Sequence, residues 1–291
     1  MTFITRFAPS PTGPLHLGHA FSALLAQDLA RAEGGQFLLR IEDIDTTRAR
    51  PEWEVQIFDD LAWLGLSWPR PVRRQSDHLP AYRAALRYLW ARGLLYPCSC
   101  SRRDIEEAAT APQEGARIGP DGIVYPGTCR PAQPPQGPLP EEAALRLDLR
   151  RALGLIQAQA MRPPLGFVER GTGPEGETGF IALDPDALID TVGDVVLARR
   201  GMGGSYHLSV VIDDAVQGIT QVVRGQDLFG ATAIHVVLQR LLQLPTPGYH
   251  HHRLIRDDQG KRLAKRDDAR AIARFREDGA SPADIRAMVG L

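Results

Sequence analysis

The chain has 291 residues with a formal net charge of −1, and 43% of its residues are hydrophobic and 24% charged. This balance is typical of a folded globular protein and excludes nucleic-acid binding through overall basicity, so any basic surface must be local. No apolar run reaches the roughly 18 residues of a membrane helix, and the N-terminus lacks a signal peptide's apolar core, so we expect a cytoplasmic protein.

The first third of the chain alternates strand and helix signals. We expect elements over residues 2–10 (strand), 19–33 (helix), 36–45 (strand), 51–64 (helix) and 80–92 (helix). Gly34 and Gly35 supply a stop signal for the first helix, and Pro51 suits the start of the second. This order predicts an α/β fold with a parallel sheet.

The chain changes character after the third helix. A segment with all three cysteines and the Pro-rich run "PAQPPQGPLPEE" predicts an inserted module. Regular pattern resumes at "YHLSVVIDDAVQGITQVVRGQDL", which predicts two strands around a turn, followed by a helix over 229–244. We therefore expect four regions: 1–96 and 191–245 as two halves of a catalytic domain, 97–190 as the inserted module, and 246–291 as a loop with a short helical end.

Two histidines, His16 and His19, stand where the first helix begins, in "GPLHLGHA". Residues three apart face the same way, and the start of a helix attracts anions. Gly13 and Gly18 would let a ligand approach the backbone closely. Phosphate binding is one interpretation; a metal pair, or plain capping and packing, are the others.

The chain holds only two lysines, Lys261 and Lys265, against many arginines. Lysine is a compact, flexible point charge. Two lysines in the Gly- and Asp-flanked segment "GKRLAKRD" suit an ATP triphosphate, where they would compensate the leaving pyrophosphate. Chance clustering in a solvated loop is the alternative.

These motifs carry a family resemblance. "HLGH" and "KRLAK" resemble the HIGH and KMSKS signatures of class I aminoacyl-tRNA synthetases, and "RFAPSPTGPLHLGHA", "RIEDID", "YHLSVVIDD" and "VVRGQDL" resemble the glutamyl-tRNA synthetase catalytic domain. The resemblance implies a Rossmann-like sheet and ATP and Mg²⁺ at the site. It makes His16, His19, Lys261 and Lys265 catalytic, with Gly18 also binding ATP.

The sequence stops at Leu291, soon after the lysine segment, and we expect no anticodon-binding domain. That shape resembles the short paralogue family, the glutamyl-queuosine tRNA(Asp) synthetases. The resemblance implies glutamate activation without tRNA, and transfer of glutamate to queuosine at the wobble position in the tRNA(Asp) anticodon stem-loop. We expect a monomer.

The cysteines lie in "YPCSC" and "YPGTCR". Three thiolates are a plausible zinc set, and tetrahedral zinc takes a fourth ligand. No histidine lies in this stretch, and the short paralogues use a tyrosine. The resemblance therefore implies Zn²⁺ on Cys98, Cys100, Tyr125 and Cys129; three ordinary thiols and a packed tyrosine are the alternative.

The resemblance also assigns glutamate-binding residues, namely Arg6, Ala8, Ser10, Glu42, Tyr206 and Arg224. An arginine fork matches a carboxylate, and an acidic side chain such as Glu42 suits the α-ammonium group. Four residues depart from the full-length synthetases: Val210, Gln226, Leu228 and Ala264. The first three are typical of the short paralogue, whereas Ala264 removes the serine of the KMSKS pattern.

Three other functions stay open. A minimal ligase for tRNA(Glu) would share every active-site residue. A small-molecule nucleotidyltransferase can also carry an HxGH motif, and an inactive paralogue could bind RNA. For the run His250, His251 and His252, beside basic residues, we favour proximity to nucleotide or RNA backbone over a metal site.

Overall fold

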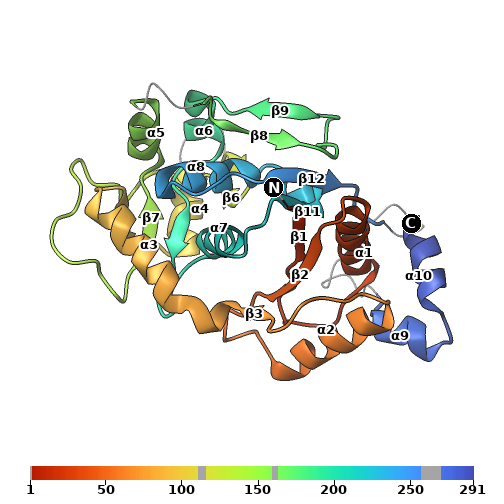
Figure 1. The fold of residues 1–291 in the computed structure, drawn as a ribbon. Helices are drawn as coiled ribbons and strands as arrows, with labels where there is room; N and C mark the ends of the chain where they lie inside the picture. Colours follow the sequence, from red (N-terminus) through yellow and green to blue (C-terminus); the bar gives the residue numbers. More distant parts are fainter. Residues whose placement is uncertain (1, 111–115, 159–162, 257–269) are drawn as a thin grey trace.

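The computed structural model describes residues 2–110, 116–158, 163–256 and 270–291 (Figure 1). The helices are α1 Leu17–Ala32, α2 Pro51–Trp63, α3 Leu79–Ala91, α4 Arg102–Thr110, α5 Leu149–Gln157, α6 Pro185–Thr191, α7 Tyr206–Val216, α8 Thr232–Leu242, α9 Ile272–Glu277 and α10 Pro282–Val289. None of these helices is both long and apolar enough to cross a membrane, within the residues described.

The strands are β1 Ile4–Phe7, β2 Gln36–Ile41, β3 Arg73–Arg74, β4 Leu95–Cys98, β5 Ile118–Gly119, β6 Gly122–Ile123, β7 Ala144–Leu147, β8 Gly166–Glu169, β9 Gly179–Ala182, β10 Val196–Ala198, β11 Gln221–Gly225 and β12 Gly248–His252. A short 3-10 helix, η2, spans Gln226–Leu228.

The central strands are parallel. β1 pairs with β2, β2 with β3, and β11 with β12, each in parallel register. β1 and β11 lie next to each other in Figure 1, and the Thr220 N–H donates to the Ile4 carbonyl at 3.0 Å. The predicted α/β fold with a parallel sheet is confirmed.

Helix α1 packs closely against this sheet because the residues on its inner face are small. Ala20, Ala23 and Ala26 are fully buried, and the Thr5 hydroxyl donates to the Ala26 carbonyl at 2.9 Å. Small side chains let the helix backbone approach the strands, and Leu24 fills the remaining space. This close packing fixes the start of α1 at the edge where the strands end.

One predicted element is wrong. The stretch "YHLSVVIDD", predicted as a strand, forms helix α7. Ser205 caps the helix by accepting from the Leu208 N–H, and every residue from 207 to 214 is buried. A helix buried on all sides shows no amphipathic period, so its β-branched residues suggested a strand.

The region predicted as an insertion contributes strands to three sheets, of which the smallest is the antiparallel pair β5–β6. β4, β7 and β10 form an antiparallel sheet, whereas the β8–β9 hairpin joins β12, with Glu169 opposite Tyr249. Strand β12 carries the histidine run and was not predicted. The boundaries of the inserted module stay a prediction.

Candidate active site

A cavity of about 360 Å³ lies where β1, β2, β11 and β12 end and α1 begins. Its lining brings together eight residues predicted from the sequence: Arg6, Ala8, His16, Gly18, His19, Glu42, Tyr206 and Arg224. Ser10 lines a neighbouring cavity of about 390 Å³, which shares Glu42, Tyr206 and Leu228 with the first. Lys261 and Lys265, with Ala264, lie outside the described residues.

The two motif histidines build the start of α1. His16 is the N-cap residue, and its Nδ1 accepts from the Gly18 N–H at 3.1 Å. His19 reciprocates, because its Nδ1 accepts from the His16 N–H, also at 3.1 Å. A neutral imidazole that accepts through Nδ1 carries its proton on Nε2. Both rings therefore have a donor nitrogen on the side opposite the backbone.

Gly18 lets the rings adopt this arrangement. A Cβ at position 18 would lie 3.0 Å from Cε1 of His16, closer than ordinary van der Waals contact. The His16 and His19 rings lie 3.8 Å apart, centre to centre. The predicted phosphate role and the capping alternative are thus compatible, because one ring can serve both.

A buried ionic network supports the floor of the cavity. Asp214 Oδ1 accepts from Arg6 Nε at 2.9 Å and from Arg40 Nη1 at 2.7 Å. Burial raises the pKa of Asp214, but the charges of Arg6 and Arg40 outweigh it and hold the pKa below the usual range. Arg6 thus enters the cavity already paired with a carboxylate.

Asp213 anchors the other side of this network. It accepts from Arg73 Nε at 2.8 Å and from the Tyr82 hydroxyl at 2.9 Å, and lies 3.8 Å from Arg40 Nε. Sequence reasoning missed Asp213, Asp214 and Arg40. Their signal was present, since a "DD" pair in an otherwise apolar run needs buried cations, and "RIEDID" offers one.

Glu42 follows β2 and faces the cavity. Arg40 Nη2 donates to it at 3.1 Å, and the Glu42 side chain is only 8% exposed. Burial raises the pKa of Glu42 above its usual value, with Arg40 opposing the shift. A cationic group arriving in the cavity would therefore gain a partner whose charge is poorly solvated.

Arg224 ends β11 under different conditions. Its Nε donates to His251 Nε2 at 3.1 Å, its Nη1 to His235 Nδ1 at 3.1 Å, and its Nη2 to Thr232 Oγ1 at 2.6 Å. In the described part of the chain Arg224 forms no ion pair. It is thus held by uncharged acceptors, unlike Arg6.

The residues expected to differ from the full-length synthetases lie in different places. Val210 is 2% exposed within the main hydrophobic core. Gln226 Nε2 donates to the carbonyls of Thr172 and Gly173, which joins η2 to the loop after β8. Leu228 lines the second cavity as well as the first.

The histidine run faces the sheet and the cavity. His252 lines the cavity and bonds Ser22 of α1 at 2.6 Å, while His251 bonds Glu169 and Arg224. Over the residues that the structure describes, the cysteines form the only close group of three or more metal-ligand side chains. His251 and His252 therefore take part in the hydrogen bonding around the cavity.

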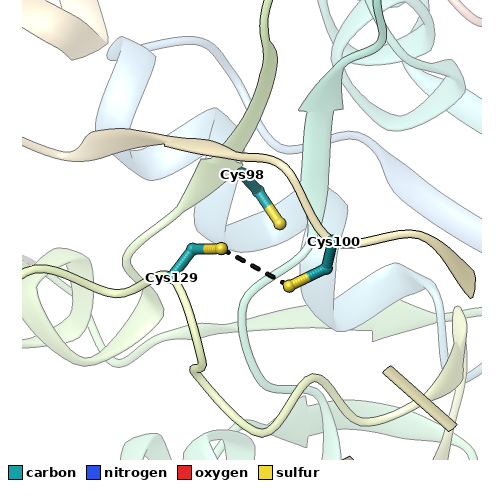
Figure 2. A group of neighbouring side chains, drawn as sticks. All are labelled: Cys98, Cys100 and Cys129. Carbon is teal, nitrogen blue, oxygen red and sulfur yellow. Dashed lines mark hydrogen bonds between the residues drawn. The ribbon is translucent and has the colours of Figure 1, made fainter. Parts of the chain in front are cut away.

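The three cysteines lie close together (Figure 2). The Sγ atoms of Cys98, Cys100 and Cys129 lie within 4.8 Å of one another. The Tyr125 hydroxyl lies 3.5 Å from Cys98 Sγ and 3.4 Å from Cys100 Sγ. A hydrogen bond from Tyr125 is the main reason that the pKa of Cys129 falls to about 6. The four predicted ligands therefore meet at one point.

Comparisons with known proteins give a consistent result. Residues 2–121 and 178–291 match the family model for the catalytic domain of class I tRNA synthetases (E and Q). The chain is 64% identical over 289 residues to the Glutamyl-Q tRNA(Asp) synthetase of Rhodobacter capsulatus, covering 99% of this chain and 100% of that protein. It is 41% identical to the one of Geobacter sulfurreducens, covering 94% and 79%.

Among solved structures, the chain is similar to a glutamate tRNA ligase from Elizabethkingia meningosepticum in complex with its amino acid. The TM-score is 0.73 at 25% identity. The match covers 99% of this chain but only 60% of that ligase.

Proposed function

Because this chain belongs to the class I tRNA synthetases (E and Q), we propose that it activates glutamate with ATP, without tRNA, and transfers it to queuosine of tRNA(Asp). The observation that carries this proposal is the full-length similarity to a Glutamyl-Q tRNA(Asp) synthetase at 64% identity. The cavity supports it, since cations for carboxylates and an anion for an ammonium group line one space.

Glutamate is the substrate that fits the polar lining. We place its α-ammonium group at Glu42 and its carboxylates at Arg6, Arg224 and the Tyr206 hydroxyl, with Ala8 and Ser10 on the β1 side. An ammonium charge stabilises the ionised form of Glu42, whose pKa burial has raised. Arg224 offers its positive charge to a carboxylate.

ATP would bind against the start of α1, and Mg²⁺ would supply positive charge to its phosphates. We propose that the Nε2 donors of His16 and His19 stabilise the charge that develops on the α-phosphate. A glutamate carboxylate oxygen attacks the α-phosphorus, and pyrophosphate leaves. The role of Lys261 and Lys265 in holding the pyrophosphate stays a prediction. The rate gain comes from positioning and charge stabilisation.

The second step transfers the glutamyl group. A hydroxyl of the queuosine cyclopentenediol attacks the carbonyl carbon of glutamyl-adenylate, and AMP leaves. The second cavity, which shares Glu42 and Tyr206 with the first, gives the acceptor a route to that carbonyl. We propose that the protein acts as a monomer on the tRNA(Asp) anticodon stem-loop.

We further propose that Cys98, Cys100, Cys129 and Tyr125 hold Zn²⁺. Ligands about 2.3 Å from a tetrahedral zinc lie roughly 3.5–4 Å apart, and the Cys100–Cys129 distance is 3.4 Å. Arg146 donates to Cys98 Sγ at 3.3 Å and lies 3.8 Å from the centre of the Tyr125 ring, so it offsets negative charge on the ligands. Zinc here would join β4 to the loop that carries Cys129.

The test uses labelled glutamate, ATP and two matched tRNA pools, one with queuosine and one without. We expect label only in the first pool, on tRNA(Asp). Label on tRNA(Glu) in both pools would mean a minimal glutamate-tRNA ligase and would refute the queuosine target. Absence of glutamate-dependent ATP–pyrophosphate exchange would refute glutamate activation and favour an RNA-binding paralogue or another nucleotidyltransferase.

A further inference from the structure

We infer that His235, His251 and Thr232 form a neutral clamp, which orients the Arg224 guanidinium while leaving its positive charge available to the substrate carboxylate. These three are positioning residues. The inference rests on the proposed function, because it assumes that Arg224 receives a carboxylate of glutamate.

The clamp uses three of the five N–H bonds of the guanidinium. Nε, Nη1 and Nη2 each give one N–H to an acceptor, at 3.1, 3.1 and 2.6 Å. One N–H therefore remains on Nη1 and one on Nη2, within the described part of the chain. Two N–H bonds from the two terminal nitrogens are what a carboxylate accepts in a bidentate pair.

The protonation of both rings follows from their partners. His251 Nε2 accepts from Arg224, so its proton lies on Nδ1, which faces Glu169 Oε2 at 2.5 Å. His235 Nδ1 accepts from Arg224, so its proton lies on Nε2, which faces His207 Nδ1 at 3.1 Å. Each ring thus has one defined donor and one defined acceptor.

The carboxylates of Glu169 and Asp121 contact the histidine rings and not Arg224 itself. Glu169 is separated from Arg224 by the His251 ring, and Asp121 by two rings, since His207 Nε2 lies 3.3 Å from Asp121 Oδ1. Burial and the Arg224 charge lower the pKa of both His251 and His235, although the hydrogen bond to Glu169 opposes the shift at His251. Both rings therefore stay neutral beside the guanidinium.

Arg6 shows what a charged partner does instead. Asp214 binds Arg6 through both carboxylate oxygens, at 2.9 and 3.4 Å. A paired guanidinium attracts a further carboxylate less strongly than an unpaired one, because the two negative charges repel each other. The cavity thus contains one neutralised arginine and one whose partners are all uncharged.

The test compares two nearly isosteric substitutions, His235→Asn and His235→Asp. Asparagine Oδ1 can replace Nδ1 as a neutral acceptor, so we expect the Kd for glutamate to stay within about threefold of the wild type. Aspartate also accepts but adds a negative charge, so we expect the Kd to rise about tenfold or more. The Kd for ATP should change by less than about twofold in both variants, because ATP lies against the start of α1 and not at Arg224.

The readout is equilibrium binding of glutamate by calorimetry, with thermal melting as the check of folding. Equal glutamate affinity in the Asn and Asp variants would overturn the inference, because only charge distinguishes them. If His235→Asp does not fold, Thr232→Asn and Thr232→Asp place the same contrast on the opposite side of the guanidinium, with the same expected order.

The proposed function has a separate readout. ATP–pyrophosphate exchange by the wild type scores glutamate activation, whereas the Asn and Asp affinities score the clamp. A wild type that binds glutamate without exchange counts against the proposed function alone. A wild type that does not bind glutamate counts against both.

Discussion

Replacing Asp214 by asparagine tests the ionic network under the cavity. The wild-type network holds three guanidinium groups, of Arg6, Arg40 and Arg73, and three carboxylates, of Glu42, Asp213 and Asp214. The Asp214→Asn variant would keep the shape of the side chain and one acceptor oxygen but would lose one negative charge. The buried guanidinium groups of Arg6 and Arg40 would then lose the carboxylate that they share.

The expected cost follows from the burial of the pair. The Asp214 side chain is 9% exposed, and those of Arg6 and Arg40 are 7% and 0%. Removing one partner from such a buried pair costs about 3–5 kcal/mol. At about 2.1 cal/mol/K of unfolding entropy per residue, 291 residues give roughly 0.6 kcal/mol/K, so the melting temperature should fall by about 5–8 °C.

The measurement is thermal unfolding at neutral pH, with Asp184→Asn as the matched control. Asp184 caps α6 by accepting from the Asp186 N–H on the surface, and asparagine caps equally well, so its melting temperature should hardly move. Because folding lowers the pKa of Asp214, this carboxylate stabilises the folded protein fully at any pH above its pKa in the unfolded chain, about 3.9. This stabilisation is lost as the pH falls through the pKa of Asp214 in the folded protein. A shift below about 1 °C at neutral pH would refute the reasoning.

Three further predictions concern the cavity and the cysteines. Gly18→Ala should displace the His16 ring and lower the rate of ATP–pyrophosphate exchange about tenfold or more. The melting temperature should hardly change, because the higher helix propensity of alanine offsets the weakened cap, and an unchanged exchange rate would contradict the geometry. Because the pKa of Glu42 is raised, the KM for glutamate should rise on acidification, starting at a higher pH than an ordinary glutamate side chain would cause. Glu42→Gln should remove this pH dependence of KM. The same pH profile in both proteins would exclude Glu42 as the partner of the ammonium group. Purified without chelator, the protein should hold about one zinc by elemental analysis and Cys100→Ser much less, whereas equal metal content would exclude the cysteine site.

The sequence was sufficient for the parts of the site that depend on local signals. His16, Gly18 and His19 sit at a helix start marked by glycines and a strand before it, and the structure places them there. The parallel sheet followed from the alternation of elements, which fixes the edge where ligands bind.

The missed parts depend on contacts between distant segments. Asp213 and Asp214 acquire meaning only when α7 is a helix that packs against Arg6 and Arg40. The role of His251 depends on the pairing of β12 with β11, which places His251 opposite Arg224. No local sequence pattern predicts which distant strands pair.

The capping arrangement at the start of α1 divides the work of each imidazole between its two nitrogens. The inner nitrogen, Nδ1, builds the helix end, and the outer one, Nε2, carries the proton that the proposed mechanism uses. An alanine at either position would therefore remove the cap, worth about 1 kcal/mol, together with the proposed chemical contribution. Asparagine can replace the inner nitrogen but not the outer one, so it should keep the stability of the helix end and lose only the activity. Alanine would lose both, and the two effects could not be told apart.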